Sequence, residues 1–125
     1  MLKTKICTIV ILSFLTLTAW ARQYTVAQVP DPKQQGQDQY VSNPDGILTD
    51  SEVDELNQIA RRIEATGKVE YAIVVISDFT AQDDDFNFAY TLFNTWGIGK
   101  KGANNGLLLL VAKDRRRYRF ITGSG

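Results

Sequence analysis

The chain has 125 residues, enough for one modest domain, and its 14 basic and 14 acidic residues give a formal net charge of zero. It contains no histidine and one cysteine, Cys7. These facts exclude His-based catalytic triads and zinc sites built from Cys and His, and the balanced charge argues against general binding to nucleic acid or anionic membranes.

The first 21 residues have the features of a secretory signal peptide. Lys3 and Lys5 precede an apolar run over residues 6–20, which closes on Ala-Trp-Ala at 19–21. A basic start, an apolar run too short to span a bilayer comfortably and a small-residue site are typical of such leaders. We therefore expect export to a periplasm or cell envelope, with an uncleaved N-terminal anchor as the alternative. Cleavage after Ala21 would leave a cysteine-free chain with a net charge of −2.

Residues 22–39 are polar and rich in glutamine, with Pro30 and Pro32 and no amphipathic period. Because such a segment buries too little apolar surface to offset the entropy of ordering it, we expect a flexible linker. The folded domain is expected over residues 40–125.

Two helices and the first strand are predicted next. After the turn-rich residues 42–46, Thr49 and Glu52 have the spacing of a capping box, and apolar residues recur at helical spacing until Gly67. The β-branched and nearly continuous apolar residues 69–76 predict a buried strand. The three aspartates at 83–85 suit the positive end of a second helix, whose apolar period continues to Trp96.

A glycine-rich loop over 97–106 leads into a second buried strand at 107–112, and residues 117–121 predict a returning strand. A strand–helix–strand unit with this crossover predicts a right-handed parallel pair, to which the hairpin adds an antiparallel strand. The fold class is therefore α/β, a mixed sheet with helices packed on it. Two helices leave one sheet face thinly covered, so we expect that the domain lacks its C-terminal part.

Gly97, Gly99 and Gly102 match the pattern G-x-G-x-x-G. In dinucleotide-binding domains this pattern follows a strand and opens a helix, whereas here it follows a helix and leads into a strand. We therefore expect a surface loop and no bound nucleotide.

Two charged clusters have alternative interpretations. The aspartates at 83–85 could ligate a metal, but we interpret them as compensation of the helix dipole. The hairpin arginines could bind a phosphate or an acidic partner, but we interpret them as a solvated hairpin, because adjacent side chains on a strand point to opposite faces. These are Arg115, Arg116, Arg117 and Arg119.

A candidate site is predicted where the two buried strands end. Asp78 lies just past the end of the first strand and Asp114 just past the end of the second, and ligands of parallel α/β sheets bind at the carboxyl ends of strands. The turn residues Asn43 and Asp45, and Asn105 in the glycine loop, are further candidates. Oxygen ligands of this kind suit Ca²⁺ or Mg²⁺. The alternative is that each is an ordinary turn residue.

Three segments carry a family resemblance: V-S-N-P-D-G-I-L-T at 41–49, Y-A-I-V-V-I-S-D at 71–78, and N-T-W-G-I-G-K-K-G-A-N-N-G-L-L-L-L-V-A-K-D-R-R at 94–116. With them the chain resembles the TPM domain, a family of exported or lumenal domains. The resemblance supports Asp78, Asn105 and Asp114 as candidate ligands or acid-site residues. The chain differs from the family in two respects. Family members usually have Asp where this chain has Asn43, and they continue past Gly125 with further helices.

The resemblance implies several activities, since relatives are described as weak acid phosphatases, as binders of divalent ions, and as accessory factors of membrane complexes. The first hypothesis is a divalent-metal-binding interaction module at the cell envelope with a membrane-protein partner. The second is a metal-assisted phosphomonoesterase with Asp78 as the catalytic carboxylate and Lys100 or Lys101 binding phosphate. The third is a non-functional fragment.

Overall fold

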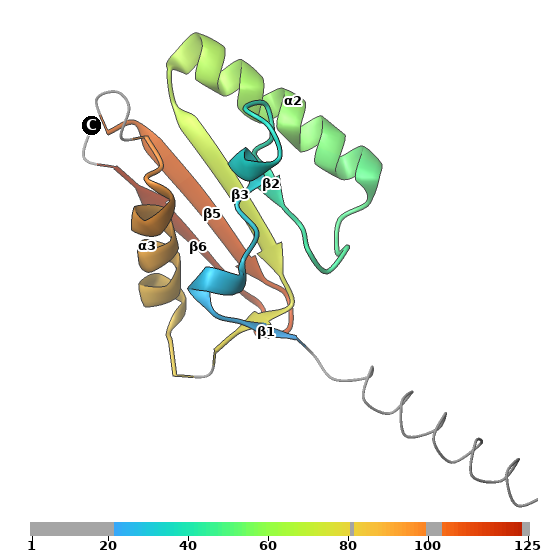
Figure 1. The fold of residues 1–125 in the computed structure, drawn as a ribbon, viewed down its shortest axis with the longest axis vertical. Helices are drawn as coiled ribbons and strands as arrows, with labels where there is room; N and C mark the ends of the chain where they lie inside the picture. The colour runs from blue at the N-terminus through green and yellow to red at the C-terminus, as the bar shows by residue number, and fades with distance from the viewer. Residues whose placement is uncertain (1–21, 81, 100–103, 124–125) are drawn as a thin grey trace, which may run out of the picture.

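The fold is seen in a computed structural model that describes residues 22–80, 82–99 and 104–123 (Figure 1). The predicted signal peptide, residues 1–21, lies outside the described residues.

A four-stranded mixed sheet forms the centre of the domain. Its order is β2 (Val41–Ser42), β3 (Glu70–Ile76), β5 (Gly106–Ala112) and β6 (Arg117–Thr122). The first three strands run parallel, and β6 pairs antiparallel with β5. The predicted α/β class, with a parallel pair of buried strands and an antiparallel hairpin, is confirmed.

The two long helices begin and end where the sequence indicates. In α2 (Asp50–Gly67) the Thr49 side chain accepts from the Glu52 N–H, and the Glu52 carboxylate accepts from the Thr49 N–H, so the predicted capping box is formed. In α3 (Asp85–Trp96) the carboxylate of Asp84 caps the first turn, and Gly97 ends the helix with a φ of 65°. The acidic run therefore does compensate a helix start, as predicted.

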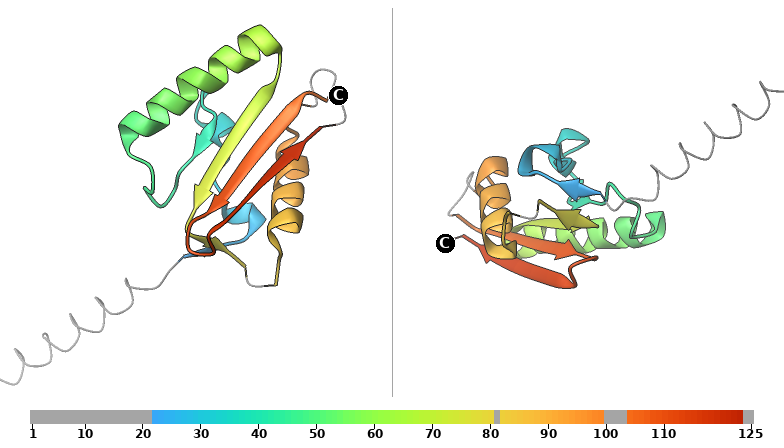
Figure 2. Two further views of the ribbon diagram at one scale, coloured as in Figure 1. Left: turned by 180° about the vertical axis from the view of Figure 1, so that it is seen from behind. Right: turned by 90° about the horizontal axis from the view of Figure 1, so that it is seen from below.

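The helices lie on opposite faces of the sheet. Alternate residues of β3 and β5 pack against α3 and form the larger core, whereas the intervening residues share a smaller core with α2. From β2 to β3 and from β3 to β5, the chain moves in the same direction along the sheet. Because α2 and α3 lie on opposite faces, the two strand–helix–strand connections have opposite handedness. The β3–α3–β5 unit is the expected right-handed one (Figures 1 and 2), and the β2–α2–β3 unit is left-handed.

The N-terminal segment, residues 22–39, differs from the flexible linker expected from its composition. It packs on the α3 side of the sheet as β1 (Gln23–Tyr24) and two short 3₁₀ helices, η1 (Val26–Gln28) and η2 (Pro32–Gln34). Strand β1 pairs in parallel with β4 (Asp78–Phe79), and its Tyr24 side chain is only 1% exposed. Two buried apolar anchors, Tyr24 and Val29, offset the ordering of a segment that is otherwise polar.

Replacing Tyr24 tests whether the N-terminal segment is part of the folded unit. We expect Tyr24→Ala to lower the free energy of unfolding by about 3 kcal/mol or more, because it removes a fully buried ring. The exposed residue Gln34 lies in the same segment, and Gln34→Ala should change the free energy of unfolding by less than about 0.5 kcal/mol. Urea unfolding of both variants checks this; equal stability of the two proteins would show that the segment is a tether.

Candidate functional site

The carboxyl edge is the end of the sheet at which β2, β3 and β5 finish. Three of the predicted acids lie there: Asp45 after β2, Asp78 at the start of β4 just past the end of β3, and Asp114 in the turn after β5. Hydrogen bonds join the loops, since the Ser77 N–H donates to Asp45 Oδ2 at 2.8 Å and the Asp114 N–H donates to the Ser77 carbonyl at 2.9 Å. The structure thus places these three residues at one edge.

The two predicted asparagines do not join them. The Asn43 side chain closes its own loop, donating to the Leu48 carbonyl at 2.9 Å and accepting from the Leu48 N–H at 3.1 Å. Asn105 precedes β5, and its carbonyl accepts from the Glu70 N–H at the opposite end of the sheet. A strand of this length separates its ends by about 20 Å, so Asn105 cannot share a ligand with Asp78.

Asp78 is held by three donors within the fold. Its Oδ1 accepts from Arg115 Nε at 2.5 Å and from the Phe79 N–H at 2.9 Å, and its Oδ2 accepts from Gln23 Nε2 at 3.1 Å. Burial is the largest single influence on this carboxyl and opposes its ionisation. The three hydrogen bonds and the Arg115 charge together outweigh burial, so the pKa of Asp78 lies below its usual value.

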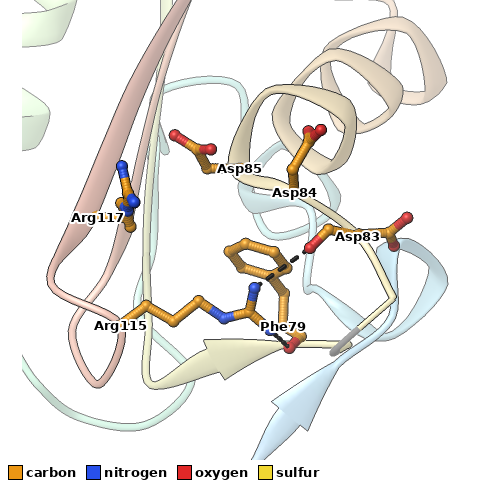
Figure 3. A pocket seen from close by; sticks show the side chains of 6 residues that line it. All are labelled: Phe79, Asp83, Asp84, Asp85, Arg115 and Arg117. Atoms are coloured by element: carbon orange, nitrogen blue, oxygen red, sulfur yellow. Dashed lines mark hydrogen bonds between the residues drawn. The ribbon is translucent and has the colours of Figure 1, made fainter.

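Arg115 organises the connection from β3 to α3. Its guanidinium donates to the backbone carbonyls of Phe79 (2.8 Å), Thr80 (3.3 Å) and Asp83 (3.2 Å), and it lies 3.8 Å from the centre of the Phe79 ring (Figure 3). The interpretation of the hairpin arginines as solvated is therefore wrong for Arg115. Sequence reasoning missed its role because nothing distinguishes it from the adjacent arginines.

Asp45 is held in a similar way by Tyr24. The Tyr24 hydroxyl donates to Asp45 Oδ1 at 2.6 Å, while Oδ2 accepts from the Ser77 N–H. Burial, and then this hydrogen bond, raise the pKa of Tyr24 to about 12. Burial again opposes ionisation of Asp45, but the bonds from Tyr24 and Ser77 outweigh it and lower the pKa of that carboxyl. Both β1 residues thus contact acids of the carboxyl edge.

An open cavity of about 400 Å³ lies beside this edge, between the start of α3 and the hairpin (Figure 3). Its lining consists of Phe79, Asp83, Asp84, Asp85, Arg115 and Arg117. The aspartates are engaged locally: Asp83 accepts from the Thr80 hydroxyl, Asp84 caps α3, and Asp85 pairs with Arg119 at 3.2 Å. The Arg117 side chain is exposed and has no hydrogen-bond or ion-pair partner in the described part of the chain.

Of the five predicted Ca²⁺ or Mg²⁺ ligands, the structure brings Asp45, Asp78 and Asp114 to one edge and places Asn43 and Asn105 elsewhere. Over residues 22–80, 82–99 and 104–123, no three acidic, His or Cys side chains come together in a way that could hold a metal ion. Asp45 and Asp78 already have protein donors at both oxygens. The predicted phosphate-binding Lys100 and Lys101, and Gly102 of the glycine motif, lie outside the described residues.

The fold and edge define a small α/β domain with a mixed sheet, acids at the carboxyl end and an N-terminal segment packed across that end. A family model described as TPM domain matches residues 41–125. The chain therefore belongs to the TPM domain family, in agreement with the resemblance of its three segments.

Two solved structures have the same fold. One is the solution NMR structure of the N-terminal domain of a protein from P. gingivalis, with 31% identity and a TM-score of 0.73 over 82% of this chain and 64% of that chain. The other is the N-terminal domain of the cg2496 protein from Corynebacterium glutamicum, with 19% identity and a TM-score of 0.57 over 82% of this chain and 62% of that one. This chain thus spans a little under two thirds of either domain. No curated protein was found to match it.

The Asp78–Arg115 pair predicts a pH dependence. A carboxyl whose pKa is lowered by folding stabilises the protein above its unfolded pKa of about 4, and this stabilisation is lost as the pH falls through the folded pKa. We expect Asp78→Asn to lower the free energy of unfolding at pH 7 by about 1–3 kcal/mol. The variant's free energy of unfolding should also fall less than that of the wild type when the pH is lowered below about 4. Asp114→Asn, at an exposed position, is the control. Urea unfolding from pH 7 to pH 2 checks this; parallel curves for wild type and Asp78→Asn would contradict it.

Proposed function

We propose that this TPM-domain protein is an exported interaction module that acts at the cell envelope through a membrane-protein partner. The observation that carries the proposal is the internal use of the edge carboxylates: Arg115 neutralises Asp78, and Tyr24 and Ser77 satisfy Asp45. A catalytic base or nucleophile must reach its substrate with an open lone pair. Carboxylates that accept hydrogen bonds from neighbouring loops support a rigid binding domain more than a hydrolase.

Export is supported by the leader pattern of residues 1–21. Of the helices in the described ranges, none combines the length and apolar character that crossing a membrane requires.

A phosphomonoesterase is the second candidate, and the cavity beside α3 is the observation that favours it. Arg117 supplies an exposed guanidinium there, and such a group binds phosphate oxygens well. Asp78 is not among the lining residues, so in this function it would orient Arg115 instead of attacking the substrate.

Addition of Ca²⁺ or Mg²⁺ tests the divalent-ion hypothesis separately. Because both oxygens of Asp45 and of Asp78 already accept hydrogen bonds from the protein, we expect either ion to shift the midpoint of thermal unfolding by less than about 1 °C relative to chelator. A bound ion at a hundred times its dissociation constant would add about 2.7 kcal/mol, which is a shift of several degrees. An upward shift that disappears in Asp78→Asn would instead establish an ion at the carboxyl edge.

Cross-linking and turnover together separate the two functions. In intact native cells, we expect cross-linking of the tagged protein to give a discrete species in the envelope fraction that contains one other polypeptide. The purified protein should not hydrolyse p-nitrophenyl phosphate above background, with or without Mg²⁺. Turnover abolished by Arg117→Gln would support the phosphatase, and a protein that never cross-links to another polypeptide would rule out the interaction module.

A further inference from the structure

The predicted leader-cleavage position lies very close to a buried anchor. Cleavage after Ala21 makes Arg22 the first residue of the processed chain, so that only Arg22 and Gln23 precede Tyr24. The Tyr24 side chain is 1% exposed, and its strand β1 pairs with β4. The amino group that cleavage produces is therefore held at the carboxyl edge whenever β1 is paired.

The pairing register places Arg22 beside Ser77. Gln23 is opposite Asp78 in the parallel pair, so one step back along both strands brings Arg22 opposite Ser77. Neighbouring strands lie about 4.8 Å apart, and the Ser77 N–H donates to Asp45 Oδ2 at 2.8 Å. The backbone nitrogen of Arg22 is thus a close neighbour of the Asp45 carboxylate.

Asp45 has no ion-pair partner among the described residues. It accepts hydrogen bonds from two neutral donors, the Tyr24 hydroxyl and the Ser77 N–H. Burial opposes its ionisation, but these bonds and the nearby Arg22 charge outweigh burial and lower the pKa of Asp45. A carboxylate has about four acceptor sites, so a further donor can be bound. The ion pairs found in the described ranges are Asp38–Arg61, Asp78–Arg115 and Asp85–Arg119.

The Arg22 side chain does not supply this partner. Its guanidinium carbon lies 4.9 Å from the centre of the Tyr24 ring, which is a cation–π contact and not an ion pair with Asp45. The position that remains for a cation next to Asp45 is the backbone nitrogen at the start of β1, and that nitrogen is uncharged until the leader is removed.

We propose that removal of the leader produces an α-ammonium group on Arg22 that binds Asp45 and thereby fixes β1 at the carboxyl edge. A leader peptidase hydrolyses the Ala21–Arg22 bond, and the hydroxyl of water goes to the Ala21 carbonyl and its hydrogen to the Arg22 nitrogen. At pH 7 the new carboxyl group loses its proton and the new amine gains one. This inference rests on the export included in the proposed function, and it makes leader removal a step that completes the fold.

The same geometry fixes the order of the two events. Proteases cleave segments that are exposed and free of tertiary contacts. Pairing of β1 buries Tyr24 only three residues after Ala21, and so holds the cleavage position against the domain. Cleavage therefore precedes the pairing of β1, and the precursor has no positive charge at this nitrogen to stabilise the paired state.

Moving the new amino group by one residue tests the inference. The full 125-residue protein, and a variant with one glycine inserted between Ala21 and Arg22, are produced in native cells and purified from the exported fraction. Mass spectrometry should show that the wild type begins at Arg22 and the variant at the added glycine. The insertion preserves every side chain and the terminal charge but displaces the ammonium group by about 3.4 Å.

Amide hydrogen exchange at Thr80 reports the pairing of β1, because the Thr80 N–H donates to the Tyr24 carbonyl at 3.1 Å. We expect the inserted glycine to speed this exchange by at least about threefold at low salt, and by less at high salt. The Glu70 N–H, which donates to the Asn105 carbonyl at the opposite end of the sheet, is the internal control. Its exchange should change by less than about twofold.

Replacing Asp45 shows whether this carboxylate receives the charge. In Asp45→Asn the insertion should no longer alter exchange at Thr80, whereas in Asp114→Asn, at an exposed position of the same edge, it should keep its full effect. Circular dichroism shows whether each variant folds. Acetylation of the α-amino group of the processed wild type is a second test that leaves Asp45 intact, and it should speed Thr80 exchange as the insertion does.

Three results would overturn the inference: a processed chain that begins at another residue, Thr80 exchange that neither the insertion nor acetylation changes, or an effect of the insertion that persists in Asp45→Asn. If the protein is neither exported nor cleaved, the proposed function fails together with the inference. If export and cleavage at Arg22 are found but Thr80 exchange is unchanged, the inference alone fails. If Thr80 exchange responds as expected but no cross-linked partner is found, the inference stands and the interaction function fails.

Discussion

The arrangement of the carboxyl edge depends on the guanidinium of Arg115. One group from the β5–β6 turn neutralises Asp78, donates to three backbone carbonyls between β3 and α3, and stacks on Phe79. Phe79 ends strand β4, the Thr80 carbonyl also accepts from the Asp83 N–H, and Asp83 lies two residues before α3. Hydrogen bonds to a charged group are stronger than neutral ones, so this single side chain fixes where α3 starts relative to the sheet.

The second constraint at this edge comes from the N-terminal segment. Tyr24 extends its hydroxyl to Asp45, and Asp45 in turn accepts from the Ser77 N–H, so three segments far apart in sequence meet at one carboxylate. Parallel sheets commonly use the ends of their strands for ligands. Here β1 lies at that position, where Gln23 donates to Asp78 and Tyr24 donates to Asp45.

Local signals predicted the long elements well because each depends on a few neighbouring residues. The capping box at Thr49 and the apolar run of β3 need no distant partner, and both are found as expected. The two-residue strands β1, β2 and β4 carry no such signal, since two residues cannot show a period. The roles of Tyr24 and Arg115 depend on partners more than 20 positions away, and the left-handed β2–α2–β3 crossover depends on the whole sheet.

The same alternation that made β5 predictable as a strand also explains why its two faces differ. Leu108, Leu110 and Ala112 are almost fully buried under α3 and the N-terminal segment, whereas Leu109 and Val111 are only partly covered. A sheet that is closed on one side and half covered on the other concentrates its unburied apolar surface in one strip. Tyr118 and Phe120 enlarge this strip in the described part of the chain, because they pair with Val111 and Leu109 on the neighbouring strand and are themselves exposed.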